Sequence, residues 1–203
     1  TIAHAIVSKY DDILPLHRQE KISRREGFRI PRSTLCGWFA PSSTFLSGIV
    51  DAMFEEDKAT AFCIATDATS APVRVTRALP CANWHVFVFV AGDGHIVFRH
   101  APTHDAATLA AMLARYKGYL LGDAASIYSP LVTAGTVLLV CCWAHVRRYF
   151  YKAIDSDRPR AVEAIAIIGK LFEVERACAT LPLAEKTARR AELARPVLAL
   201  FDD

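Results

Sequence analysis

The sequence lacks any apolar run long enough to cross a bilayer. Its longest, residues 136–144, falls far short of the roughly 20 residues that a membrane helix needs. It also lacks a CxxC pair among its six cysteines and shows no secretory leader, so we expect reduced thiols in a cytoplasmic protein. Its net charge, +3 over 203 residues, is too small to indicate nucleic-acid binding by itself.

The composition indicates a folded protein. The sequence is 53% hydrophobic and mixes charges of both signs, which suits one globular domain with an appendage, or two small domains. The chain begins at Thr1 without Met and stops directly after a helical pattern. We expect both ends to be cuts rather than natural termini.

The excess of positive charge lies in residues 1–40, which hold seven basic and four acidic side chains. A helix with Leu16 and Ile22 on its apolar face, an interruption at Gly27 and a second helix from Ile30 form a helix-turn-helix-like pattern. The second helix would then enter the major groove of DNA. An ordinary helical hairpin with a solvated basic face fits the pattern equally well. The candidate DNA-binding side chains in this region are Arg18, Lys21, Arg24, Arg25, Arg29 and Arg32.

A linker and a further helix are expected after this basic region. Pro41 and the hydroxyl residues that follow it predict a linker or a helix start, and residues 45–58 predict a helix with Phe45 and Ile49 inward. Near the other end of the chain, Asp157 begins a long helix with Val162 on its apolar face. A charged helix follows to about residue 194, and Pro196 is expected to begin a separate short one.

Between these helical parts the pattern predicts an antiparallel meander. The short apolar run of residues 62–65 suits a strand buried on both faces and ended by Asp67. Residues 84–90 and 95–99 predict two more strands, joined at Asp93-Gly94, which is a strong hairpin signal.

A helix and two more strands complete the expected core. Thr103 or Asp105 caps the helix, a fourth strand ends in Asp123, and residues 136–141 make a fifth strand. This order matches the ribonuclease-H-like fold, in which the first and fourth strands lie side by side. Asp67 and Asp123 would then meet and hold divalent cations for attack on a phosphodiester. A turn-capping role is the common alternative for a single Asp.

Several stretches, in this order, resemble the transposases of the insertion sequence 66 family. They include residues 8–27 (SKYDDILPLHRQEKISRREG), residues 30–38 (IPRSTLCGW) and the Thr66-Asp67-Ala68-Thr69 block. Gly122-Asp123 with Tyr128 and the run CWAHVRRYF at residues 142–150 follow. The family usually has Glu after the first acid and Gly-Tyr after the second, where this chain has Ala68 and Ala124-Ala125.

The resemblance implies a DDE-type transposase that cuts and joins DNA at insertion-sequence ends with Mg²⁺ or Mn²⁺. Its α/β fold would be a ribonuclease-H-like core, a mixed five-stranded sheet with helices, over residues 59–153. A helix-turn-helix-like DNA-binding region would occupy residues 1–58, and a helical insertion residues 154–203. Asp67 and Asp123 would be the catalytic and metal-binding acids. The family's third acid, a Glu in a downstream Asn-Asn block, has no counterpart in this sequence, and Glu163, Glu173 and Glu175 are not assigned to it.

The resemblance also implies partners and a location. These are the element's terminal repeats and target DNA, further copies of the protein on that DNA, possible accessory transposition proteins and no membrane, in the nucleoid of a bacterial cytoplasm. Cys142 and His145 could supply two zinc ligands, but a structural site needs four. One interpretation has Trp143 pack inward and His145, Arg147 and Arg148 face outward. The favoured functional role for these last three is contact with DNA phosphate near the metals.

Two other functions remain open from the sequence. The first is a DNA-binding remnant of a transposase that kept its fold and basic arm but lost its chemistry. The second is a structure-selective nuclease on the same fold, which would cut DNA junctions without strand transfer. Salt-dependent binding to element-end DNA would favour the transposase and the remnant over the nuclease.

Overall fold

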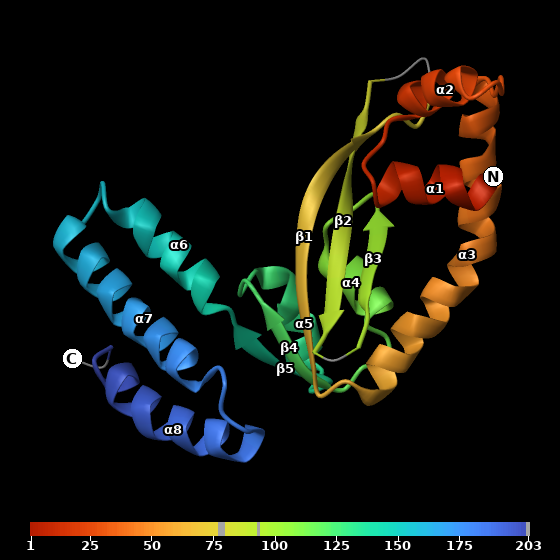
Figure 1. Ribbon diagram of the computed structural model, residues 1–203. Helices are drawn as coiled ribbons and strands as arrows, with labels where there is room; N and C mark the ends of the chain where they lie inside the picture. The colour runs from red at the N-terminus through yellow and green to blue at the C-terminus, as the bar shows by residue number, and fades with distance from the viewer. Residues whose placement is uncertain (77–79, 93, 202–203) are drawn as a thin grey trace. The chain divides into compact units, whose positions relative to one another are not determined.

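The computed structural model describes residues 1–76, 80–92 and 94–201. They form two compact units, Thr1–Thr60 and Ala61–Asp203, which are drawn in Figure 1. Each unit is described by itself below. Within the described residues, no helix is both long and apolar enough to cross a membrane.

The first unit consists of three helices, α1 (Ile2–Tyr10), α2 (Leu16–Arg25) and α3 (Arg32–Thr60). The buried Gln19 joins α1 to α2, because its Nε2 donates to the carbonyl oxygens of Ala5, at 3.2 Å, and Leu14, at 3.1 Å. Gly27 has a φ of +89° between α2 and α3, a conformation that glycine adopts without strain. The expected succession of helix, glycine turn and helix is therefore present.

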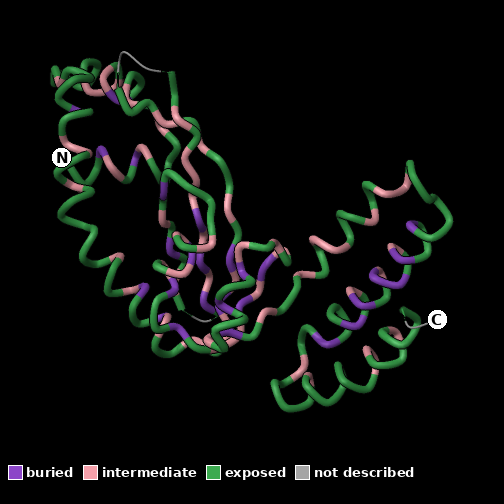
Figure 2. The backbone as a smooth tube through the Cα atoms, turned by 180° about the vertical axis from the view of Figure 1, so that it is seen from behind, coloured by how far each residue is buried: buried purple, intermediate pink, exposed green. Residues whose placement is uncertain are grey.

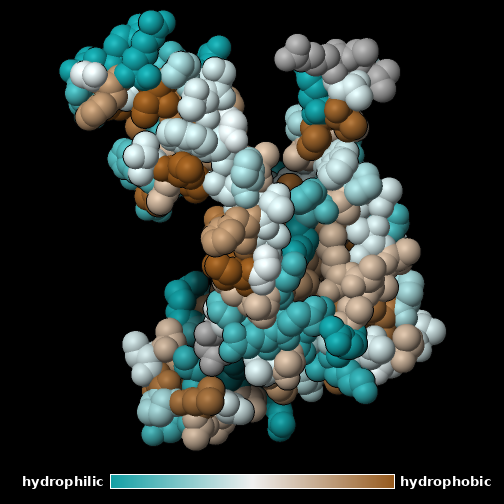
Figure 3. Space-filling view, turned by 90° about the vertical axis from the view of Figure 1, so that its right-hand side faces the viewer, coloured by the Kyte–Doolittle hydropathy of each residue, from teal (hydrophilic) through white to brown (hydrophobic). Residues whose placement is uncertain are grey.

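The expectation of a linker at Pro41 is wrong, because α3 runs unbroken through it. A proline inside a helix removes one backbone donor and costs about 3 kcal/mol. Here Ser42 Oγ donates to the Trp38 carbonyl at 2.7 Å, next to the Gly37 carbonyl that Pro41 leaves without its helical donor. Phe45 and Ile49, expected inward, are exposed on α3. The space-filling view likewise shows apolar residues in several separate surface patches (Figure 3).

The second unit is built on a mixed five-stranded sheet in the order β3-β2-β1-β4-β5. The strands are β1 (Cys63–Val73), β2 (Ala82–Ala91), β3 (Ile96–Ala101), β4 (Gly118–Gly122) and β5 (Val137–Cys141). β1, β2 and β3 pair antiparallel, whereas β4 pairs parallel with both β1 and β5. The expected meander and the neighbouring first and fourth strands are confirmed. Asp93 of the expected hairpin signal lies outside the described residues.

Two expectations about the first strand are wrong. β1 does not end at Asp67 but continues to Val73, and all of this extension pairs with β2. The strand is also not buried on both faces, since Ile64 and Thr66 are buried while the residues between them are only partly so. An antiparallel sheet with one packed face gives such an alternation.

The sheet has one buried and one more open face. Helices α4 (Ala106–Met112) and α5 (Ser129–Thr133) and the 3₁₀ turn η1 (Ser126–Tyr128) lie on one side of it (Figure 1). Asp105 caps α4 by accepting from the backbone N–H of Thr108 at 2.8 Å. The buried face has Phe87 and Phe89 at its centre. On the other face, Asp67 is in register with Val88 and Phe98, and Ala65, on the same face, is in register with Val90, Ile96, Leu121 and Val140. All six of these partners are exposed or half-buried.

Three helices follow the sheet: α6 (Trp143–Ala153), α7 (Arg158–Cys178) and α8 (Leu183–Ala199). Asp157 caps α7 as expected, and α7 packs against both α6 and α8. The buried stripe of α7 contains Ile168 and Leu171 (Figure 2), whereas Val162, expected on that stripe, is exposed. The expected break at Pro196 is wrong, because α8 continues through it.

Candidate functional site

Two carboxylates lie at matching positions of neighbouring parallel strands. The last paired residues of β1 and β4 are Ala65 and Leu121, so Asp67 and Asp123 each stand two residues past the last pair on their own strands. Adjacent strands run about 4.8 Å apart. The pairing of β1 with β4 therefore places Asp67 and Asp123 at neighbouring backbone positions, as expected from the order of the strands in the sequence.

Each aspartate is oriented by its own backbone. Oδ1 of Asp67 accepts from the N–H of Ala68 at 2.8 Å, and Oδ1 of Asp123 accepts from the N–H of Ala125 at 3.1 Å. In the turn after β4, Ala124, which stands between Asp123 and Ala125, has a φ of +64°, which is strained for a residue with a side chain. One oxygen of each carboxylate is thus held by the adjacent backbone, within strand β1 for Asp67 and in the turn after β4 for Asp123.

Tyr128 is the last residue of η1, which follows Asp123 along the chain, and it is almost fully buried. Burial is the main cause of its raised pKa, and the negative charges of Asp123 and then Asp67 raise that pKa further. Both carboxylates thus act on the same hydroxyl through their negative charge. The Tyr128 ring fits there because Gly122 has no side chain: a Cβ at that position would lie 2.8 Å from Cζ of the ring.

His145 approaches the first carboxylate from α6. Its Nε2 lies 4.0 Å from Oδ2 of Asp67, and its side chain is 20% exposed. The outward orientation considered for His145 is therefore wrong. Trp143, considered inward, is instead exposed and stacks on Phe201 with ring centroids 5.5 Å apart. Two contacts determine the rotation of α6 about its axis: that of His145 with Asp67 of β1 and that of Trp143 with Phe201.

A small pocket of about 190 Å³ opens beside Asp67. Two buried polar atoms of residues that line it, Thr66 Oγ1 and His145 Nδ1, have no hydrogen-bond partner in the described part of the protein. A buried polar group without a partner costs about 1–3 kcal/mol, so two such atoms at one pocket are unusual in a folded protein. The remaining lining is mostly apolar: Ala65, Val88, Val90, Leu121, Gly122 and Cys142.

The donor set around Asp67 and Asp123 fits a hard divalent cation. Carboxylate oxygens are the ligands that Mg²⁺ prefers, and Mg²⁺ commonly binds through only one or two carboxylates while keeping several waters. Among the described residues, no group of three or more His, Cys, Asp or Glu side chains is placed to hold a metal. Cys142 and His145 thus have no third zinc ligand in that part of the chain.

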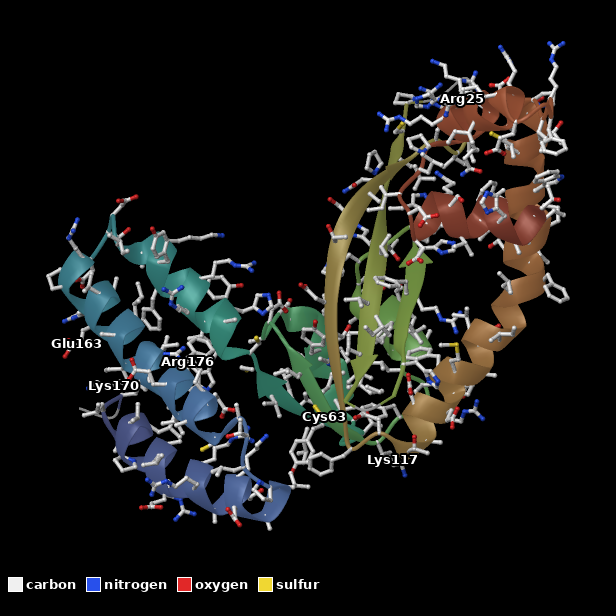
Figure 4. The ribbon with its side chains drawn as sticks, in the orientation of Figure 1. Arg25, Cys63, Lys117, Glu163, Lys170 and Arg176 are labelled. Carbon is white, nitrogen blue, oxygen red and sulfur yellow. The ribbon has the colours of Figure 1, made fainter. Side chains whose placement is uncertain are left out.

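The predicted basic residues of the first unit lie along and after α2. Arg18, Lys21, Arg24 and Arg25 line a shallow groove of about 430 Å³ together with Ile22, and Arg25 projects from the end of the helix (Figure 4). Arg24 also pairs with Glu20 at 3.5 Å. Arg29 follows in the connection to α3, and Arg32 is the first residue of α3.

The remaining predicted side chains, Arg147 and Arg148, are exposed on α6. Arg147 lines a groove between α6 and α7 opposite Arg176, which points toward α6 (Figure 4). The sequence reasoning gave no role to Lys152 and Tyr151, which are exposed on the same helix. Their helical spacing from Arg148 is the signal that could have found them.

Comparisons with known proteins identify the chain's relatives. The model of the family described as "Transposase IS66 family" matches residues 1–203. Two similar curated proteins come from Sinorhizobium fredii (strain NBRC 101917 / NGR234). "Uncharacterized protein y4qI" is 28% identical over 99% of this chain and 40% of its own length, and "Uncharacterized protein y4hP" is 26% identical over 100% and 40%. The chain thus spans about two fifths of the length of these relatives.

Proposed function

We infer the function from one premise, that the chain belongs to the IS66 family of transposases. We propose that it forms the DNA-binding and central catalytic part of a DDE-type transposase, which cuts DNA at insertion-sequence ends and joins it to a target. The core would be ribonuclease-H-like. The observation that carries this proposal is the matching position of Asp67 and Asp123 on the parallel strands β1 and β4.

The strand order supports the ribonuclease-H-like assignment. Three antiparallel strands followed by two parallel ones, with β1 central, give the order β3-β2-β1-β4-β5. The more open sheet face around Asp67 carries apolar side chains that are exposed or half-buried, such as Val88 and Phe98, which a further helix of the longer protein would cover. The relatives are longer than the matched part, and we assign the third acid, a Glu, to the remainder of such a longer protein.

Asp67 and Asp123 would hold Mg²⁺ or Mn²⁺, which supplies Lewis acidity to the scissile phosphate and to the attacking water or 3′-hydroxyl. The backbone N–H groups of Ala68 and Ala125 hold one oxygen of each carboxylate and leave the other oxygen for the cation. Tyr128 is protonated at neutral pH, as a tyrosine ordinarily is, and its raised pKa keeps it protonated to higher pH, so it adds no third negative charge. The imidazole of His145 limits the freedom of the Asp67 side chain.

Basic side chains would hold the DNA. In the helix-turn-helix-like unit, Arg18, Lys21, Arg24, Arg25, Arg29 and Arg32 would neutralise phosphates, and α3 would enter the major groove. Arg147 and Arg148 start within a turn of His145 on α6, so they would contact phosphates near the cation. We expect the protein to act as a homo-oligomer on DNA.

A Mn²⁺ titration of this 203-residue chain tests the carboxylate pair. We expect a dissociation constant on the order of millimolar for two carboxylates without a third. Asp67→Asn and Asp123→Asn should each abolish binding while circular dichroism shows the fold retained. Glu163→Gln on the exposed side of α7 (Figure 4) is the matched control and should bind as the parent does.

The titration separates the enzyme from the DNA-binding remnant. Equal binding by the parent and both Asn variants would overturn the carboxylate site. If the chain then still bound element-end DNA with a strong salt dependence, the DNA-binding remnant would be the function that survives. Strand transfer by a longer member that carries the Glu would exclude a structure-selective nuclease.

A further inference from the structure

Helix α6 presents a mixed basic and aromatic surface directly beside Asp67. We define the α6 surface as His145, Arg148, Tyr149, Tyr151 and Lys152. Spacings of three and four residues place them on one contiguous side of the helix, which starts at the half-buried His145 next to Asp67. The four other members are exposed, Tyr149 by 59% and Tyr151 by 64%.

The cations of this helix are left for an external partner. α6 contains Arg147, Arg148 and Lys152 and no acidic residue. In the described part of the protein none of the three forms an ion pair, whereas cations of α7 and α8 do. For example, Arg190 pairs with Glu175 at 2.6 Å. The charge of α6 is therefore complementary to an anionic ligand rather than neutralised within the fold.

The two exposed tyrosines of the α6 surface indicate which kind of anionic ligand it suits. Phosphates alone require only the cations, and a stacked duplex offers phosphates and sugars to a surface of this kind. An exposed aromatic ring gains most from the flat face of a base, which becomes accessible only where the strand is unpaired. The rings lie on either side of Arg148 and Lys152 by helical position, so bases and phosphates could alternate across the surface.

We propose that the α6 surface binds an unpaired DNA strand as it leaves the site at Asp67. Arg148 and Lys152 bind its phosphates, and Tyr149 and Tyr151 stack on its bases. The distance from His145 to Lys152 along the helix is about 10 Å, enough for about three nucleotides at the spacing of a stacked strand. This inference rests on the proposed function, because it assumes that the ligand of the site is DNA.

Binding of matched single-stranded and duplex oligonucleotides, followed by fluorescence anisotropy, tests the proposal. Tyr149→Ser and Tyr151→Ser should each weaken single-strand binding by about fivefold or more and leave duplex binding nearly unchanged. Tyr→Phe variants keep the ring and should bind like the parent. Arg148→Ala should weaken both ligands and lower the salt slope by about 0.7 for the single strand.

Two control variants separate the α6 surface from general exposure. Phe98→Ser removes an equally exposed aromatic ring from β3, and Arg160→Ala removes an exposed cation that already pairs with Asp157. Both should bind single strands like the parent. If Phe variants lose as much as Ser variants, or if single-strand and duplex binding fall together, stacking is refuted while the DNA-binding proposal stands. If the parent binds neither oligonucleotide, both proposals fail.

Discussion

Replacing Gly122 by alanine tests how closely the turn that carries Asp123, directly after β4, is packed. The added methyl group would lie 2.8 Å from Cζ of Tyr128 and 3.0 Å from its Cε2 and Oη. Carbon atoms are in favourable contact at about 3.5–4.0 Å, so the ring would have to shift by roughly 1 Å. Tyr128 is 3% exposed and has no room to move freely. We expect the free energy of unfolding to fall by about 1–3 kcal/mol, as for other overpacked cores.

Urea denaturation followed by circular dichroism measures this loss as a lower midpoint at an unchanged slope. Gly169→Ala on α7 is the matched control, because nothing lies within 4 Å of the methyl group that it adds. Within a helix this second substitution should raise the free energy of unfolding by about 0.5–1 kcal/mol. The same chemical change is thus expected to have opposite signs at the two positions.

A second background shows whether the Tyr128 ring is the cause. Tyr128→Leu removes Cζ, Cε2 and Oη, the three atoms that the new methyl group would meet. In that background Gly122→Ala should cost much less than in the parent, giving a clear coupling free energy. An equal loss in both backgrounds would refute the packing argument.

Two more substitutions test the same turn. Tyr128→Phe should lose less stability at alkaline pH than the parent does, as measured by urea unfolding between pH 9 and 11. The raised pKa of Tyr128 keeps this residue protonated in the folded state, whereas in the unfolded state it ionises at about pH 10. The free energy of unfolding of the parent therefore falls as the pH rises through this range, and the variant lacks this contribution. A parent and variant with the same pH slope would contradict this. Ala124→Gly should stabilise the protein by about 0.5–1 kcal/mol, because glycine adopts a φ of +64° without strain. The control Ala125→Gly, at a φ of −63°, should destabilise the protein. Thermal or urea unfolding measures both changes, and stabilisation by both variants or by neither would refute backbone strain at Ala124.

The strand order could be predicted because it follows from local patterns taken in sequence. Period-two alternation and apolar runs located the strands, and the pairing of β1 with β4 followed from their order. The lengths of the elements were harder. β1 continues past Asp67 because β2 offers it partners as far as Val73, and no local signal at Asp67 reports a distant strand. α3 passes through Pro41, although a proline inside a helix removes a backbone donor and so usually marks an end or a kink in a sequence.

The orientation of α6 could not be predicted from its own sequence. Periodicity describes which residues share a face but not which face meets a neighbour. In the structure α7 packs on one side of α6, and Trp143 stacks on Phe201, far along the chain. These contacts turn His145 toward Asp67. Tyr128 was visible in the sequence as part of a block, but its contact with Gly122 appears only once η1 folds back over β4.

The positions of the Asp67 and Asp123 carboxylates depend mainly on the backbone pairing of β1 with β4. β1 and β4 determine the separation of Asp67 and Asp123, and each side chain is held by a backbone N–H within two residues. The alanines at 68 and 125 contribute those N–H groups, which any residue except proline could donate. Small side chains beside the acids therefore leave the carboxylate pair intact. Changes that alter Gly122 or Tyr128 should disturb it more, because they act on the packing beneath the turn.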